Sequence, residues 1–199
     1  MREEQHALEE LSTRRPATYE DVLAAPEHVV AEIIDGELIT SPRPRLRHAS
    51  TTGALFHALY DPFHLGQGGP GGWWIVFEPE LHFGADVLVP DLAAWRRERL
   101  PHLPDAAWMS LAPDWLCEVL SPSTCTIDRS RKLPIYAREG VSHVWLMDPV
   151  ARTTEILRRD GAVWVIARVS SNRDALRAEP FDAIEIDSRR LWHADVDLL

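Results

Sequence analysis

Lysine is almost absent from this chain of 199 residues. Of the 21 lysine and arginine side chains, Lys132 is the only lysine. A lysine ammonium is a compact charge that can orient a water molecule, and because its pKa can shift, it can lose its proton and then deprotonate the water; a guanidinium cannot give up its proton. A chain that uses arginine everywhere else would use arginine for an ordinary ion pair. The lone lysine therefore favours a chemical role, although an i,i+4 ion pair with Asp128 is the alternative explanation.

Cysteine and long apolar runs are also scarce. The two cysteines, Cys117 and Cys125, are too few for a disulfide framework or, by themselves, for a zinc site, so we expect a reduced protein. No run approaches the ~20 apolar residues of a membrane span, and the first fifteen residues lack the apolar core of a signal peptide. These absences predict a cytoplasmic protein with no membrane partner.

The net charge of −10 argues against a protein that coats nucleic acid without specificity, because the two would repel each other. It does not exclude a nuclease, since an acidic metal-binding cleft adds negative charge until the metal arrives. The length suits one domain with a sizeable core. We expect a charged extension over residues 1–15 and a single domain over 16–199.

The chain around residues 113–149 predicts the centre of the fold. Two short apolar runs, 115–120 and 143–147, are typical of buried strands, and a helix is expected over 127–139. Such a unit places its strands in parallel with a right-handed crossover. Hairpin signals at Asp35-Gly36 and Asp160-Gly161 add antiparallel strands. The predicted class is therefore α/β, with a central mixed sheet flanked by helices. Pro134 should kink this helix or restart it near Lys132.

Three carboxylates lie in or next to expected strands, at Glu32, Asp91 and Glu118. A carboxylate in an apolar strand costs several kcal/mol unless it is paired or binds a metal. The alternatives are that Glu118 points into water from an edge strand, that Glu32 lies on an exposed face, and that Asp91 only forms a turn. Converging carboxylates without histidine or thiolate suit Mg²⁺ or Mn²⁺. With a lysine beside them, they are the parts for metal-assisted phosphodiester hydrolysis.

A basic, proline-punctuated loop follows the first hairpin. It carries Arg43, Arg45 and Arg47 within five residues and ends at His48. It is either a solvated loop or a contact to a phosphate backbone. Residues 48–64 then have the pattern of a helix.

Taken together, these stretches resemble the PD-(D/E)XK phosphodiesterase superfamily and, more narrowly, the Uma2 family of restriction-endonuclease-like domains. The matching segments are EIIDGELITSP (32–42), His48, VPD (89–91), CEVLSPST (117–124), Asp128, Lys132, Tyr136, Gly140-Val141 and VWLMDP (144–149).

The resemblance implies a restriction-endonuclease-like core in which Asp91, Glu118 and the carbonyl of Val119 hold the metal. It implies that Glu32 is the family's early acidic residue. We expect His48 to lie with the arginine loop at the substrate backbone. Leu120 stands where the superfamily has its lysine. The resemblance therefore implies that the lysine has moved to the following helix, as Lys132.

The expected function is that of a Mg²⁺- or Mn²⁺-dependent endonuclease acting on DNA, and a homodimer is compatible with it. One alternative is a non-catalytic domain that keeps the nuclease fold and binds nucleic acid or protein, which Leu120 and the acidic charge favour. A hydrolase of a small phosphorylated substrate is another. Metal-dependent cleavage of plasmid DNA would separate the first from the other two.

Overall fold

The computed structural model describes residues 15–192. The expected N-terminal extension therefore lies outside the described residues, apart from Arg15. Within them, no helix combines the length and the apolar character needed to cross a bilayer.

A mixed sheet forms the centre of the fold, as predicted. Its strand order is β10-β9-β8-β7-β6-β3. The strands are β3 (Trp73–Phe77), β6 (Leu92–Arg96), β7 (Trp115–Val119), β8 (His143–Asp148), β9 (Thr153–Asp160) and β10 (Val163–Ser171). In this sheet β7 and β8 pair in parallel, and the other neighbours are antiparallel.

The crossover from β7 to β8 is a helical segment of three parts. These are α4 (Cys125–Ile127), a π-helical turn η2 (Asp128–Lys132) and α5 (Leu133–Arg138). Pro134 lies in the first turn of α5, where its missing N–H matters least. The predicted restart of the helix near Lys132 is thus confirmed, and Gly140, in the left-handed conformation at φ 88°, follows its end.

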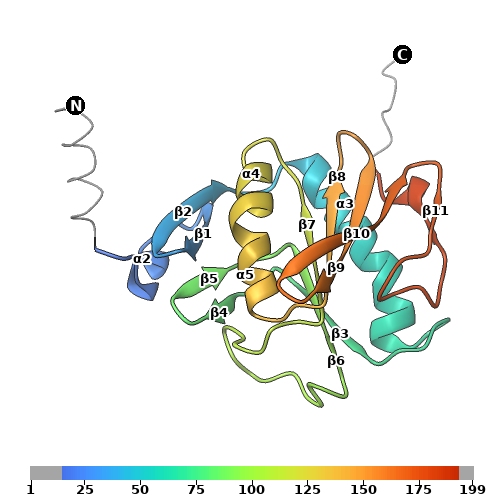
Figure 1. The fold of residues 1–199 in the computed structure, drawn as a ribbon, viewed down its shortest axis with the longest axis horizontal. Coiled ribbons are helices and arrows are strands. Elements are labelled where there is room, and N and C mark those ends of the chain that lie inside the picture. Colours follow the sequence, from blue (N-terminus) through green and yellow to red (C-terminus); the bar gives the residue numbers. More distant parts are fainter. Residues whose placement is uncertain (1–14, 193–199) are drawn as a thin grey trace.

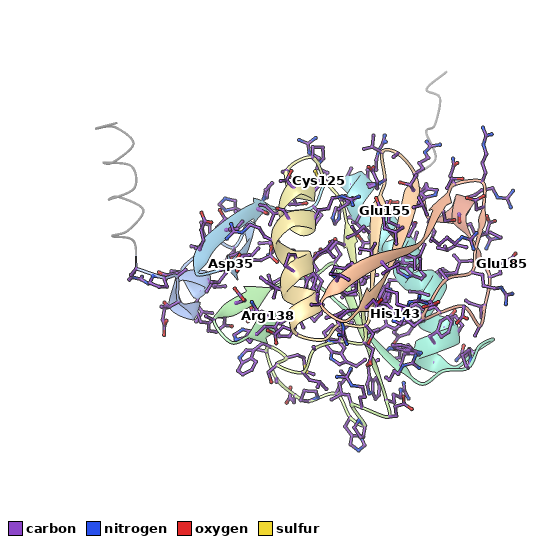
Figure 2. All side chains as sticks on the ribbon, viewed as in Figure 1. Asp35, Cys125, Arg138, His143, Glu155 and Glu185 are labelled. Atoms are coloured by element: carbon purple, nitrogen blue, oxygen red, sulfur yellow. The ribbon has the colours of Figure 1, made fainter. Side chains whose placement is uncertain are left out.

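A smaller, four-stranded sheet has the order β2-β1-β5-β4. Its strands are β1 (Val29–Ile34), β2 (Glu37–Pro42), β4 (Leu81–Phe83) and β5 (Asp86–Leu88), and α2 (Tyr19–Leu23) precedes it. The predicted hairpin is present, with both turn residues at positive φ, Asp35 at 53° and Gly36 at 77°. Figure 2 shows Arg138 at the end of α5, beside this sheet. Arg138 donates a hydrogen bond of 2.7 Å to Asp86 and ties the end of α5 to the sheet.

Side-chain alternation on β7 divides the core into two layers. Trp115, Cys117 and Val119 pack on the side of α3 (Leu46–Leu59) and of the π-helical turn η1 (Tyr60–Leu65). Leu116 and Leu120 pack on the opposite side, with α5 and the smaller sheet. The helical segment α4–α5 therefore lies between the two sheets, and α3 lies behind the larger one (Figure 1).

The remaining elements are short. They are β11 (Ala175–Leu176), β12 (Ile186–Asp187) and the 3-10 helix η3 (Ser188–Arg190). The segment between β6 and β7 contains no helix. That segment consists of turns and bends and makes one isolated bridge, between Leu81 and Met109.

Candidate active site

Asp91 and Glu118 lie side by side because their strands are neighbours in the larger sheet. Leu92 of β6 pairs with Cys117 of β7. Asp91 precedes Leu92 and Glu118 follows Cys117, so this pairing places Asp91 next to Glu118. The backbone N–H of Val119 donates a hydrogen bond of 2.7 Å to Oδ2 of Asp91. A backbone N–H of the sheet thus fixes the carboxylate of Asp91, and a residue that only forms a turn would not require this contact.

Glu118 points toward the helical segment, because it shares the face of Leu116 and Leu120. β7 is an inner strand of the sheet, and Glu118 is only 3% exposed. The alternative of an edge strand pointing this carboxylate into water is therefore wrong.

Lys132 meets Glu118 across fourteen positions of sequence. Its Nζ lies 3.1 Å from Oε1 of Glu118 and 2.9 Å from Oε1 of Glu32. The ion pair with Asp128 is present too, but at 3.6 Å it is the longest of the three. An ordinary i,i+4 pair thus accounts for only part of the surroundings of this lysine.

Glu32 comes from the smaller sheet and is 5% exposed, so the exposed-face alternative is wrong for this residue as well. Its Oε1 accepts a 2.8 Å hydrogen bond from the N–H of Val89 in addition to the lysine contact. The structure therefore brings Glu32, Glu118 and Lys132 into direct contact.

Asp128 and Tyr136 complete the cluster, and sequence reasoning did not assign them to the site. The hydroxyl of Tyr136 donates a 2.7 Å hydrogen bond to Oε1 of Glu118. Asp128 is 3% exposed and Tyr136 is fully buried. They lie four positions before and after Lys132, so helical spacing from the single lysine could have found both.

His48 lies in the first turn of α3 and faces Asp91. Its Nε2 is 3.3 Å from Oδ1 of Asp91. Although we expected His48 among the contacts to the substrate backbone, the contact that the structure shows is to this carboxylate.

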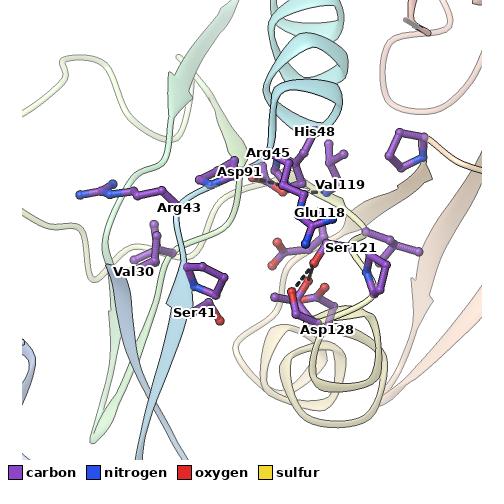
Figure 3. A pocket seen from close by; sticks show the side chains of 18 of the residues that line it. Val30, Ser41, Arg43, Arg45, His48, Asp91, Glu118, Val119, Ser121 and Asp128 are labelled. Carbon is purple, nitrogen blue, oxygen red and sulfur yellow. Dashed lines mark hydrogen bonds and ion pairs between the residues drawn. The ribbon is translucent and has the colours of Figure 1, made fainter. Parts of the chain in front are cut away.

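One pocket of about 420 Å³ is lined by the charged members of the cluster and by His48, namely Glu32, His48, Asp91, Glu118, Asp128 and Lys132. Residues of the Ser121–Thr124 turn line it, as do Arg43, Arg45 and Arg47. The arginines do not all point the same way. Figure 3 shows Arg43 directed away from Glu118 and Asp128, and Arg43 donates a 3.0 Å hydrogen bond to the carbonyl of Glu27.

Comparison with known proteins gives the family of the chain. The family model Uma2, described as "Putative restriction endonuclease", matches residues 16–189. The chain belongs to the Uma2 family. No curated protein matches this Uma2 chain.

Among solved structures, the Uma2 chain is similar to a protein from Anabaena variabilis ATCC 29413. That protein is described as a "putative nuclease belonging to DUF820". The two share 23% identity over 88% of this chain and 97% of the other, with a TM-score of 0.67. At this identity the likeness shows a common fold.

The charges of the Uma2 site are unbalanced. Burial raises the pKa of Glu118 well above its ordinary value, and the neighbouring carboxylates add to this against the opposing effect of Lys132. Burial also raises the pKa of Asp128. For Lys132, burial lowers the pKa, but the adjacent carboxylates outweigh it and raise the pKa well above the ordinary value. Lys132 therefore stays protonated, and one ammonium serves several carboxylates.

A divalent cation would relieve this imbalance. Within residues 15–192, no three His, Cys, Asp or Glu side chains gather in an arrangement that could hold a metal. Mg²⁺, however, is commonly bound by one or two carboxylates, with water and substrate phosphate as its other ligands. Asp91 and Glu118, with the carbonyl of Val119, supply hard oxygen donors of that kind. Among the described residues, Lys132 and Tyr136 both donate to Oε1 of Glu118, which leaves Oε2 for a cation.

Proposed function

We propose that this protein is a metal-dependent endonuclease that hydrolyses DNA phosphodiester bonds. The observation that carries the proposal is the meeting of Asp91, Glu118 and the only lysine, Lys132, in a pocket that arginines line. Carboxylates alone would repel a phosphodiester. A divalent ion between them and the phosphate, with guanidinium groups at the rim, would allow it to approach.

Asp91, Glu118 and the Val119 carbonyl would hold Mg²⁺ or Mn²⁺. When bound, the ion supplies positive charge that offsets negative charge developing on the phosphate. Its binding would rely on the backbone contact that fixes Asp91 and on the Tyr136 hydroxyl that fixes Glu118.

Lys132 would orient the attacking water by donating a hydrogen bond. Its raised pKa keeps it protonated, so in the resting cluster it donates and does not accept a proton. Because its contact with Asp128 is the longest, it can turn one N–H toward the pocket and keep Glu32 and Glu118. In this scheme Glu32 positions the ammonium.

Arg45, Arg47 and the Ser121–Thr124 turn would receive the phosphate backbone, since all of them line the pocket. Arg–phosphate pairs are charge-assisted and often bidentate. DNA is thus the proposed partner, and the arginines position it without reading its sequence.

Nicking of a supercoiled plasmid with Mn²⁺ tests the proposal. The parent should cut, and Asp91→Asn and Glu118→Gln should not. Glu155→Gln is the control, because Glu155 pairs with Arg129 outside the pocket. Calorimetric titration with Mn²⁺ should show binding that Asp91→Asn and Glu118→Gln abolish. A parent that binds no ion and cuts no plasmid would refute the proposal.

A non-catalytic role is the second candidate, favoured by one observation. Three of the carboxylates are already in contact with Lys132, so the cluster has a cation of its own. A protein of this kind would bind DNA equally well with and without Mn²⁺ and leave it intact.

A further inference from the structure

A second cleft, of about 640 Å³, adjoins the pocket. The two share four lining residues, namely Val30, Arg43, Glu78 and Val89. Its walls come from α2, β1 and the loop before β7, including Leu103 and Pro104. A cleft of this size accommodates a small organic group such as a nucleobase.

Arg43 and Glu78 are the charged residues at the border between pocket and cleft. Glu78 has a left-handed backbone, at φ 42°, which is unfavourable for a residue with a side chain. Its N–H donates a 3.0 Å hydrogen bond to the carbonyl of Asp91. The backbone at this border is thus tied directly to the candidate active site.

Trp108 gives the second cleft an aromatic wall. One face of its ring stacks on His82, with centroids 4.4 Å apart and planes 12° apart. His82 is in turn held by Glu80, 2.6 Å from its Nε2, and by the edge of Tyr19. Yet Trp108 remains 43% exposed. The indole is therefore a supported platform with a face available for stacking.

The charges of the second cleft and of the pocket differ, so that the cleft suits the base of a nucleotide and the pocket suits its phosphate. The second cleft has three glutamates, Glu27, Glu78 and Glu80, against the single Arg43, and its other lining residues are apolar. Such walls disfavour a phosphate and suit a flat, uncharged group. The pocket next to it is lined by Arg45 and Arg47, which can meet a phosphate. Its carboxylates Glu32, Glu118 and Asp128 gather around Lys132 instead.

We propose that the second cleft is a base subsite, in which one unpaired nucleobase stacks on Trp108 while its phosphodiester lies in the pocket. This inference rests on the proposed function, because it takes the pocket to be the phosphodiester site. A base inside a duplex cannot reach such a wall without leaving its stack. The preferred substrate is thus single-stranded DNA, or a duplex with an unpaired nucleotide at the cleavage position.

Fluorescence anisotropy with a short labelled DNA strand, in calcium buffer, tests the subsite. Stacking of a base on an aromatic side chain contributes ~1–3 kcal/mol by alanine substitution, which is roughly 5- to 150-fold in Kd. Trp108→Ala should weaken binding by that factor, and Trp108→Phe, which keeps a ring, should retain most of the affinity. Phe77→Ala is the matched control, because Phe77 is equally exposed, at 44%, and lines neither hollow.

Two further DNA ligands keep the test independent of the folding of any variant. The parent should bind the single strand more tightly than the same sequence as a duplex. It should also bind an abasic strand about as weakly as Trp108→Ala binds the intact one. Equal affinity of the parent for intact and abasic strands would overturn the subsite. It would also be overturned if Trp108→Ala weakened binding of the intact strand and of the abasic strand by the same factor.

The plasmid assay separates this inference from the nuclease proposal. A parent that cuts DNA but binds intact and abasic strands alike refutes the base subsite alone. A parent that never cuts, yet binds strands in a base-dependent and Trp108-dependent way, refutes the nuclease proposal and leaves the subsite as a binding site. A parent that binds no strand at all refutes the subsite.

Discussion

Replacing Lys132 by methionine should be among the most destabilising substitutions in the chain. Methionine has a similar length but no charge, and the lysine side chain is 5% exposed between carboxylates at 2.9, 3.1 and 3.6 Å. Removing one partner of a buried ion pair leaves uncompensated charge and costs about 3–5 kcal/mol. For a protein of this size each kcal/mol lowers Tm by ~2–4 °C, so we expect a loss of roughly 6–20 °C.

The matched control is Arg129→Met on the same helical segment. Arg129 also pairs with a glutamate, Glu155, but its side chain is 42% exposed. Exposed pairs contribute ~1 kcal/mol or less. Urea unfolding and thermal melting of both variants give the comparison, and a Lys132→Met loss no larger than that of Arg129→Met would refute the reasoning.

The Lys132→Met variant should also respond more strongly to Mn²⁺ than the parent. Without the ammonium, the carboxylates of Glu32, Glu118 and Asp128 can be neutralised by the metal. An ion present at 100 times its Kd stabilises the folded state by about 2.7 kcal/mol. The variant should likewise regain stability as the pH falls, because the pKa of Glu118 and of Asp128 is already raised by burial and both take up protons. Equal Mn²⁺ shifts in variant and parent would show that the ammonium does not occupy the place of a cation.

Three other predictions follow from the same geometry. Tyr136→Phe removes the hydroxyl that donates to Glu118, so it should destabilise the fold by about 1–3 kcal/mol in urea unfolding and weaken Mn²⁺ binding in calorimetry. Neutralising Arg45 and Arg47 together should weaken DNA binding and flatten its dependence on log salt concentration by about 0.9 per lost phosphate contact, and the same change at the exposed arginines of η3 should leave the slope as it is. Burial lowers the pKa of His48, but the hydrogen bond to the Asp91 carboxylate and the nearby negative charge together outweigh burial, and the net pKa is raised. The charged imidazole therefore stabilises the folded state fully below about pH 6.5, and this contribution is lost as the pH rises through the raised pKa. Chemical unfolding of the parent and of His48→Gln across that range should show the loss only in the parent.

The parts of the fold that follow from local signals could be predicted from sequence. Asp35-Gly36 placed a hairpin, and the short apolar runs placed β7 and β8 on either side of a helix. The pairing of Asp91 with Glu118 was implied by the family resemblance and by no local signal, and it arises because their strands are neighbours in one sheet. Composition alone singled out Lys132, because the chain has no other lysine.

What the sequence could not give depends on packing between distant segments. Glu32 and Lys132 are a hundred positions apart, and no local pattern joins their two elements. The π-helical turn that ends at Lys132 has no signal apart from Pro134 after it. The direction of Arg43 is set by a carbonyl sixteen residues earlier in the chain.

The contact between Glu32 and Lys132 joins the smaller sheet to the helix of the larger one. Anything that moves the ammonium away from Glu32 therefore weakens one attachment of the β1–β2 hairpin to that helix. Arg131, which contacts Glu37 and the carbonyl of Ile34, provides another. Amide hydrogens of that hairpin should consequently exchange with deuterium at a rate that depends on what occupies the site. The backbone of the hairpin can then report the ligation of the site without any label in the pocket itself.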